Sequence, residues 1–212
     1  MKKILFLGIV LIIIFIIYLC NIDKKVYYVA LGNGTDMIDG NYNYPHYIKD
    51  YLKKRKVLEK YLDDFSERNV KITDIINDIN DNRKMITNKG NFTMKNVLIK
   101  ADLVTISFDV KEVYFMKKGG FSSDEVYNYI DELVKDAADL FKLIRQYCKE
   151  DIIFIGFNGN DKFINYLNRR FKKICDVNDI EYVYVNDLKK NDFEKVANRV
   201  IKKIDKKVFM DK

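Results

Sequence analysis

A regular alternation of short apolar runs and longer amphipathic stretches along residues 26–212 is the strongest constraint on the fold. Runs rich in β-branched and aromatic residues are typical of buried strands; they lie at residues 26–31, 101–108, 151–157 and 181–185, with a weaker one at 61–65. Stretches with apolar residues three and four apart predict helices; they lie at residues 44–61, 73–83, 122–144, 163–175 and 193–204. Strands that alternate with helices form a parallel sheet covered on both faces, so we expect a three-layer α/β/α domain.

Such a sheet binds its ligands outside the carboxyl ends of its strands. The loops to consider therefore follow the predicted strands, at residues 32–44, 66–72, 109–122, 158–162 and 186–192. In the third of these loops, Ser122 and Glu125 have the spacing of a capping box, which predicts that a long helix begins there.

The amino terminus has the composition of a membrane segment. Residues 4–20 carry no charge, and at about 1.5 Å per residue they are at the short end of what spans a hydrocarbon core of about 30 Å. Tyr18 and Leu19 occupy positions where a cleavage site or a lipoprotein box needs small residues, so an uncleaved anchor is favoured over lipidation at Cys20. Lys2 and Lys3 favour a cytoplasmic amino end. We therefore expect an anchor and linker at residues 1–25 and a domain at residues 26–212, outside the cytoplasm of a single-pass membrane protein.

Composition excludes several classes of function. The formal charge is +7, but the basic residues are scattered among 31 acidic ones, so no nucleic-acid partner is expected. Three Cys and one His are too few for a zinc ribbon or a disulfide scaffold, and no metal or cofactor is expected. Met37 stands where a dinucleotide fingerprint needs its third glycine. Cys148 and Cys175 end consecutive predicted helices and could form a disulfide or remain buried thiols.

Three stretches carry a resemblance to a known family. Residues 28–36 read YVALGNGTD, and a Tyr-Pro pair and a predicted helix follow at residue 44. This arrangement resembles the first block of the SGNH (GDSL-type) hydrolases, in which a strand reading V-A-L-G-D-S precedes a loop and a helix. Residues 101–107 resemble the strand before that family's third block, and residues 193–197 resemble its closing helix. The resemblance covers residues 26–212 and implies a flavodoxin-like three-layer fold with a mainly parallel sheet and an esterase or lipase activity.

The resemblance fails at the family's catalytic positions. The nucleophilic Ser would fall on Gly34, and the Asp before it on Asn33. The glycine of the oxyanion hole falls near Asn69, and Lys111 replaces the Asn of the third block. The segment that would supply a D-x-x-H base, residues 185–193, contains no His. The resemblance therefore implies a degenerate member of the family, without its nucleophile, its oxyanion Asn or its base.

Other groups do not replace this machinery in the sequence. His46 lies at the start of a predicted helix, on the wrong element for the base, and is expected as a capping or surface residue. The hydroxyls of Thr35 and Ser107 are expected to bond main chain. Acidic loop residues are expected as caps and solvated charges rather than as cation ligands: Asp36, Asp39, Asp109 and Glu112.

The sequence thus indicates a membrane-anchored SGNH-like domain that acts by binding. The candidate pocket comprises Asn33, Gly34, Thr35, Asn69, Asp109 and Lys111. Its expected ligand is a glycan or acyl ester of the cell envelope, or a protein partner. Two alternatives stay open: an active hydrolase with a rearranged site, and a structural domain without a ligand.

Overall fold

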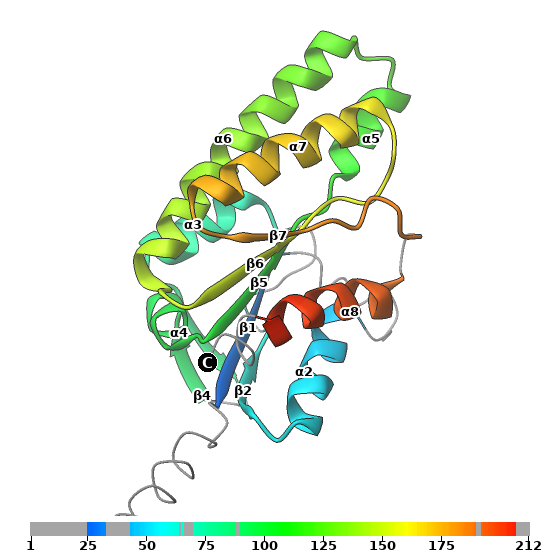
Figure 1. Ribbon diagram of the computed structural model, residues 1–212. Helices are drawn as coiled ribbons and strands as arrows, with labels where there is room; N and C mark the ends of the chain where they lie inside the picture. The colour runs from blue at the N-terminus through cyan, green and yellow to red at the C-terminus, as the bar shows by residue number, and fades with distance from the viewer. Residues whose placement is uncertain are drawn as a thin grey trace, which may run out of the picture.

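The computed structural model shows three layers, with helices on both faces of one sheet (Figure 1). It describes residues 25–32, 43–63, 65, 70–87, 90–189 and 192–206. The expected anchor up to residue 24 lies outside these ranges, as do loop residues 33–42 and 66–69. Within the described ranges, no helix has the length and apolar composition needed to cross a membrane.

The central sheet has five strands in the order β2-β1-β5-β6-β7, and all four neighbouring pairs are parallel. Its strands are β1 (Val26–Gly32), β2 (Leu58–Leu62), β5 (Leu103–Ser107), β6 (Asp151–Ile155) and β7 (Glu181–Val183). Every residue of β1 and β5 is buried, as expected for inner strands of a sheet covered on both faces. The prediction of a mainly parallel sheet is confirmed.

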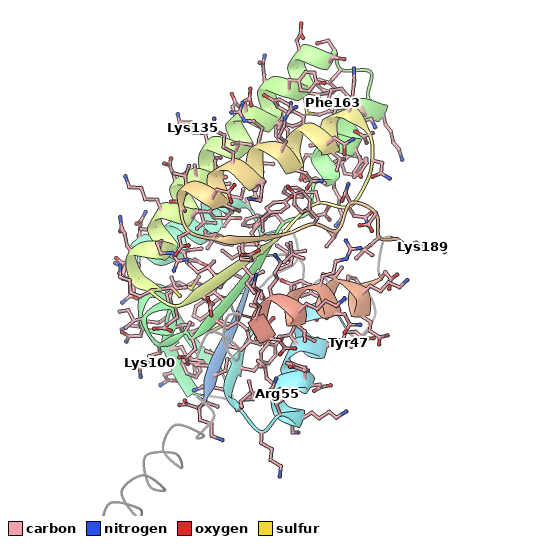
Figure 2. The ribbon with its side chains drawn as sticks, in the orientation of Figure 1. Tyr47, Arg55, Lys100, Lys135, Phe163 and Lys189 are labelled. Carbon is pink, nitrogen blue, oxygen red and sulfur yellow. The ribbon has the colours of Figure 1, made fainter. Side chains whose placement is uncertain are left out.

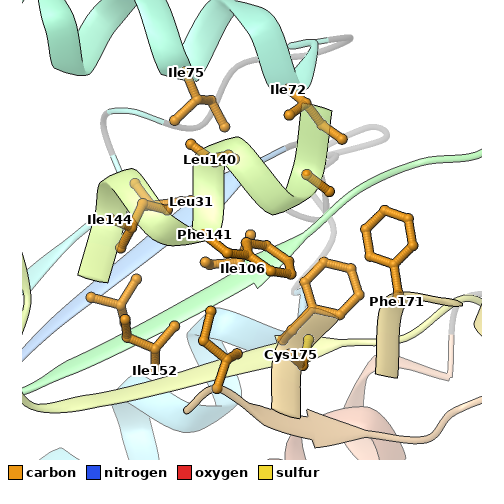
Figure 3. Close-up of a cluster of buried hydrophobic side chains, with 14 of the residues drawn as sticks. Leu31, Ile72, Ile75, Ile106, Leu140, Phe141, Ile144, Ile152, Phe171 and Cys175 are labelled. Carbon is orange, nitrogen blue, oxygen red and sulfur yellow. The ribbon is translucent and has the colours of Figure 1, made fainter. Parts of the chain in front are cut away.

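One face of the sheet packs against four helices, which bury the larger of two hydrophobic clusters. These helices are α3 (Ile72–Asn80), α4 (Met94–Lys100), α6 (Ser123–Tyr147) and α7 (Lys162–Val177). In this cluster, strand residues such as Leu31 and Ile106 meet Phe141 of α6 and Phe171 of α7 (Figure 3). Burial of such side chains contributes about 1.5–3 kcal/mol each, so this cluster is the main source of stability.

The opposite face packs against α2 (Tyr44–Lys54) and α8 (Phe193–Ile204) and buries the smaller cluster. Tyr28 and Ala30 point to this face, whereas Val29 and Leu31 point to the other, as the two-residue period of a strand requires. The uninterrupted apolar run of β1 is therefore explained by burial on both sides.

The predicted capping box is present at the start of α6. The backbone N–H of Glu125 donates to Ser122 Oγ at 3.3 Å, and the backbone N–H of Ser122 donates to Glu125 Oε2 at 2.8 Å. Two N–H groups that the helix leaves unpaired are thereby satisfied.

The prediction of one helix over residues 44–61 was wrong at its end. Lys56 has a φ of 61°, and its N–H and that of Val57 close back onto the carbonyls of Lys53 and Leu52. This pair of bonds is a Schellman motif, which ends α2 at Lys54. The chain then enters β2, which lies three residues earlier than the weaker strand predicted at residues 61–65.

Four short elements were not predicted: β3 (Lys84–Thr87), β4 (Gly90–Thr93), α4 and α5 (Lys111–Lys118). The antiparallel hairpin of β3 with β4 leads into α4, and α5 lies in the expected loop 109–122. Each strand of the hairpin has only four residues, and Val113 is the one fully buried residue of α5. Elements this short show too few periods to be recognised.

Cys148 and Cys175 are both buried, free thiols, so the thiol alternative holds rather than the disulfide. Burial raises the pKa of each thiol above its ordinary value, which keeps both in the unreactive protonated form.

Candidate functional site

The order of the strands places the candidate site at the carboxyl ends of β1 and β5. The chain passes from β1 to β2 on one side and later returns to β5 on the other side of β1. Between two such strands the crossover connections diverge, and ligands of open α/β sheets bind in the crevice that results. The strand order and the family resemblance therefore indicate the same place for the site, the carboxyl ends of β1 and β5.

Gly32 ends β1 directly beside Ser107, the last residue of β5 and its partner in the register. Its φ is 91°, and a Cβ at this position would lie 2.0 Å from the carbonyl oxygen of Ser107. Only glycine fits this backbone. The loops that follow β1 and β5 consequently begin side by side.

Asp109 and Lys111 come together in the loop after β5. Lys111 Nζ lies 2.6 Å from Asp109 Oδ2, and the two side chains are 41% and 29% exposed. Lys111 is the first residue of α5. At the position where the resemblance implies a neutral amide donor, the chain carries an ammonium group that is held by a carboxylate.

Four of the six residues proposed for the pocket lie outside the described ranges: Asn33, Gly34, Thr35 and Asn69. The first three follow Gly32 directly, and Asn69 precedes Val70, which lines a cleft at this edge. The cleft has a volume of about 340 Å³ and lies between the start of α3, the β5–α5 connection and α6. Asp109 and Lys111 both line it.

The charge of this cleft is mixed, with an excess of carboxylates. Glu112, Glu132 and Asp136 line it beside Lys71, in addition to the Asp109–Lys111 pair. Burial raises the pKa of Tyr129, another lining residue, and the negative charges of Glu112 and Asp136 raise it further. Carboxylates accept hydrogen bonds from hydroxyl groups and repel anions, so the cleft suits a neutral, hydroxyl-rich ligand.

A group of buried hydroxyls lies behind the ends of β1 and β5. Tyr28 Oη lies 2.9 Å from Thr105 Oγ1, and Tyr44 donates to Ser107 Oγ at 3.2 Å and to Thr105 Oγ1 at 3.4 Å. Ser107 is only 5% exposed. Burial raises the pKa of Tyr44 despite its bonds to Ser107 and Thr105, so Tyr44 is protonated near neutral pH. Tyr44 therefore acts as a donor and cannot take a proton from Ser107.

His46 lies in the first turn of α2. Its Nδ1 is 2.5 Å from Asn43 Oδ1, and its ring meets the ring of Tyr61 edge-on, with centroids 6.2 Å apart. The imidazole is thus engaged beside the start of the helix, which agrees with the placement expected from the sequence.

The connection after β7, where the SGNH resemblance places the catalytic base, is bonded to α8 through Arg199. Arg199 donates to both carboxylate oxygens of Asp187, at 2.6 Å each, and to the carbonyl oxygen of Tyr184 at 2.7 Å. These bonds from Arg199 lower the pKa of Asp187. Asn158, from the loop after β6, donates to the carbonyl oxygen of Val185 at 3.3 Å. The connection after β7 is therefore fixed by an ion pair.

Sequence reasoning missed the contribution of α6 and the pairing of the buried hydroxyls. The expectation that the Ser107 hydroxyl bonds main chain was wrong, because its partner is the side chain of Tyr44. Glu132 and Asp136 are one helical turn apart, a spacing that places them on one face and could have indicated a polar stripe. Thr105 is the only hydroxyl within an otherwise apolar stretch of β5 before Ser107, which was a weaker signal. Among the described residues, no group of three or more His, Cys, Asp or Glu side chains could hold a metal ion.

No protein-family model matches the sequence, and no curated protein matches it. Solved structures do match. The acetylxylan esterase Axe2 from Geobacillus stearothermophilus is 15% identical, with a TM-score of 0.63, and the match covers 86% of this chain and 95% of that protein. The lipase Lip_vut3 from a goat rumen metagenome is 13% identical, with a TM-score of 0.64, and the match covers 84% and 97%.

A family 3 carbohydrate esterase from Clostridium thermocellum matches with 11% identity and a TM-score of 0.57, over 84% of this chain and 94% of that protein. Identities this low establish the fold and leave the chemistry to the residues of this chain. The chain has the fold of the SGNH (GDSL-type) esterases, as its sequence blocks implied.

Proposed function

We propose that this protein binds an acylated or glycan component of the cell envelope at the carboxyl edge of its sheet and does not cleave it. The observation that carries this proposal is the Asp109–Lys111 ion pair, 2.6 Å long, at the position of the family's oxyanion Asn. A lysine held by a neighbouring carboxylate lines the cleft in place of a neutral amide.

Ester hydrolysis by a serine route needs a hydroxyl, a base that takes its proton near neutral pH, and donors aimed at the developing oxyanion. Gly34 offers no side chain, and the sequence has a single imidazole, that of His46. His46 is engaged with Asn43, and Ser107 accepts a hydrogen bond from a protonated Tyr44. Loss of a whole triad costs about 10⁶ in turnover, which leaves binding as the function that these residues support.

The chemistry of the cleft supports a glycan ligand. Glu112, Glu132 and Asp136 provide acceptors for sugar hydroxyls, and Tyr129 adds an aromatic side chain to the lining. Two structural neighbours are an acetylxylan esterase and a carbohydrate esterase, and acetylated carbohydrate is the class that we carry over to this chain as a proposal.

The anchor sets where this binding would occur. An uncharged stretch at residues 4–20, preceded by Lys2 and Lys3, supports a single-pass protein whose domain lies outside the cytoplasm. Only residues 21–24 separate this stretch from the described domain, so the domain would stay near the membrane surface, within reach of the polymers attached there.

Thermal unfolding of the full chain in detergent micelles, with and without acetylated wall-glycan fragments, tests the proposal. A ligand at about 100 times its dissociation constant adds about 2.7 kcal/mol of stability, which raises the melting temperature. A Glu132→Gln, Asp136→Asn double variant should lose this shift. Asp139→Asn, an exposed change on the same helix outside the cleft, should keep it.

If no fragment shifts the melting temperature, the binding proposal is wrong and a structural domain is favoured. If the double variant and its control respond equally, the ligand binds elsewhere.

A further inference from the structure

The edge of the sheet opposite the candidate site carries a larger groove. It has a volume of about 770 Å³ and lies between the first residues of β1 and β2, the β3–β4 hairpin and α4. Figure 1 shows β4 and α4 beside the beginning of β1, away from the carboxyl ends of the strands. Nothing in the proposed binding function uses this surface.

The groove is basic. Lys60, Lys84 and Lys100 line it, and within the described ranges no carboxylate forms an ion pair with any of the three. Lys60 Nζ lies 4.0 Å from the centre of the Phe92 ring, which holds the ammonium group over the hairpin. Glu59 is the acidic residue of the lining, so positive charge predominates.

Apolar side chains project into solvent around the same groove. Ile86, in β3, is 83% exposed, and Ile99, in α4, is 60% exposed. Water-exposed isoleucines among lysines are typical of surfaces that rest in the interfacial region of an anionic bilayer: the apolar groups enter the acyl boundary and the ammonium groups meet the phosphates.

The connectivity of the chain places this surface next to the uncharged stretch. Six residue steps separate the end of the stretch at residue 20 from Val26, the first residue of β1, and they span at most about 22 Å when fully extended. Tyr27 lines the groove, and Lys25 donates to the carbonyl oxygen of Lys56 at 2.8 Å. Figure 2 shows Lys100 and Arg55 on either side of the beginning of β1, so basic groups flank the point where the chain enters the domain.

We propose that this groove, with Ile86 and its three lysines, docks onto the surface of the anionic bilayer in which residues 4–20 are anchored. The inference rests on the proposed anchoring. Docking at the amino edge of the sheet turns the carboxyl edge, with the Asp109–Lys111 cleft, away from the membrane and toward the envelope polymers.

The test uses the full chain reconstituted in vesicles, with Cys20→Ser so that the remaining native thiols, Cys148 and Cys175, are buried. An environment-sensitive fluorophore is attached at Ile86→Cys, or at Phe115→Cys, a 67% exposed position in α5. With phosphatidylglycerol in the vesicles, the Ile86 label should shift to shorter wavelength and be quenched by lipids spin-labelled near the headgroup, whereas the Phe115 label should show neither effect.

Replacement of Lys60, Lys84 and Lys100 by Gln should abolish most of the quenching at position 86. A matched triple change at exposed lysines outside the groove, Lys118, Lys135 and Lys189 to Gln, should leave it unchanged. Salt at about 1 M shortens the screening length to about 3 Å and should also weaken the quenching. Vesicles of phosphatidylcholine alone should give little of it.

The outcomes separate the two proposals. If high salt or carbonate removes the chain from the vesicles, the anchoring proposal is wrong, and so is the docking proposal that depends on it. If the chain stays in the vesicles but the label at position 86 remains in water, the docking alone is wrong.

Discussion

The buried hydroxyl pair of Tyr28 and Thr105 gives a prediction about stability that can be worked from distances. Both side chains are fully buried, and their oxygens are 2.9 Å apart. Thr105→Val keeps the shape of the side chain and removes its hydroxyl. Tyr44 retains its bond to Ser107, so the change leaves chiefly the hydroxyl of Tyr28 without a hydrogen-bond partner. A buried polar group without a partner costs about 1–3 kcal/mol.

Tyr28→Phe removes the other half of the pair and should cost about 1 kcal/mol, because Thr105 still has Tyr44 as a partner. In the double variant the Tyr28 hydroxyl is absent, so no buried hydroxyl of this pair lacks a hydrogen-bond partner. We therefore expect the double variant to be less destabilised than the sum of the single changes, by about 1–2 kcal/mol.

Urea unfolding followed by far-ultraviolet circular dichroism measures these energies. With a slope of about 1–3 kcal/mol per molar urea, a loss of about 2 kcal/mol lowers the midpoint by about 1 M. Strict additivity of the two changes, or a Thr105→Val variant as stable as the wild type, would refute the hydrogen-bonded pair.

Three further predictions concern the scaffold. Gly32→Ala should destabilise the protein by at least about 2 kcal/mol in the same unfolding assay, because its Cβ would meet the carbonyl oxygen of Ser107 at a positive φ; a neutral effect would contradict the close approach of the two strand ends. Burial raises the pKa of Asp161, but hydrogen bonds from Lys117 and from backbone amides outweigh it and lower the pKa. The wild type should therefore be more stable than Asp161→Asn above about pH 4, by up to about 1 kcal/mol, and the difference should disappear as the pH falls through the lowered pKa; a constant difference in a pH series of urea midpoints would be inconsistent with this. Ser122→Ala removes a capping bond and should cost about 1 kcal/mol in thermal unfolding; an unchanged melting temperature would contradict a stabilising cap at the start of α6.

The fold could be predicted from the sequence where a regular pattern of apolar residues extends over a whole element. The run at residues 26–31 has no polar side chain except the two tyrosine hydroxyls, and the structure buries all of it in β1. The helix at residues 193–204 was predicted to the residue, since its apolar positions repeat over three turns. The end of α2 could not be predicted, because Lys56 adopts a left-handed backbone that its residue type does not indicate.

The location of the candidate site at the carboxyl edge of the sheet could be predicted from the sequence, but the side-chain contacts within it could not. The alternation of strands and helices predicts ligands at the carboxyl ends of the strands, and the sequence indicated Asp109 and Lys111 as residues of that region. The pairing of Tyr44 with Ser107 joins residues 63 positions apart, and its cause is the packing of α2 on the sheet. Glu132 and Asp136 likewise reach the cleft only through the packing of α6 against α3. No local pattern encodes such contacts.

Binding without cleavage is the central claim, and one experiment measures both halves of it. The full chain is mixed with an acetylated wall-glycan fragment, and nuclear magnetic resonance follows the bound ligand and the acetate released in the same sample. We predict broadened ligand signals with no acetate above the buffer rate, both for the wild type and for Gly34→Ser, which restores a hydroxyl without a base. Acetate release that scales with protein concentration and is abolished by Thr35→Ala or Ser107→Ala would contradict the claim and establish an active hydrolase with a rearranged site.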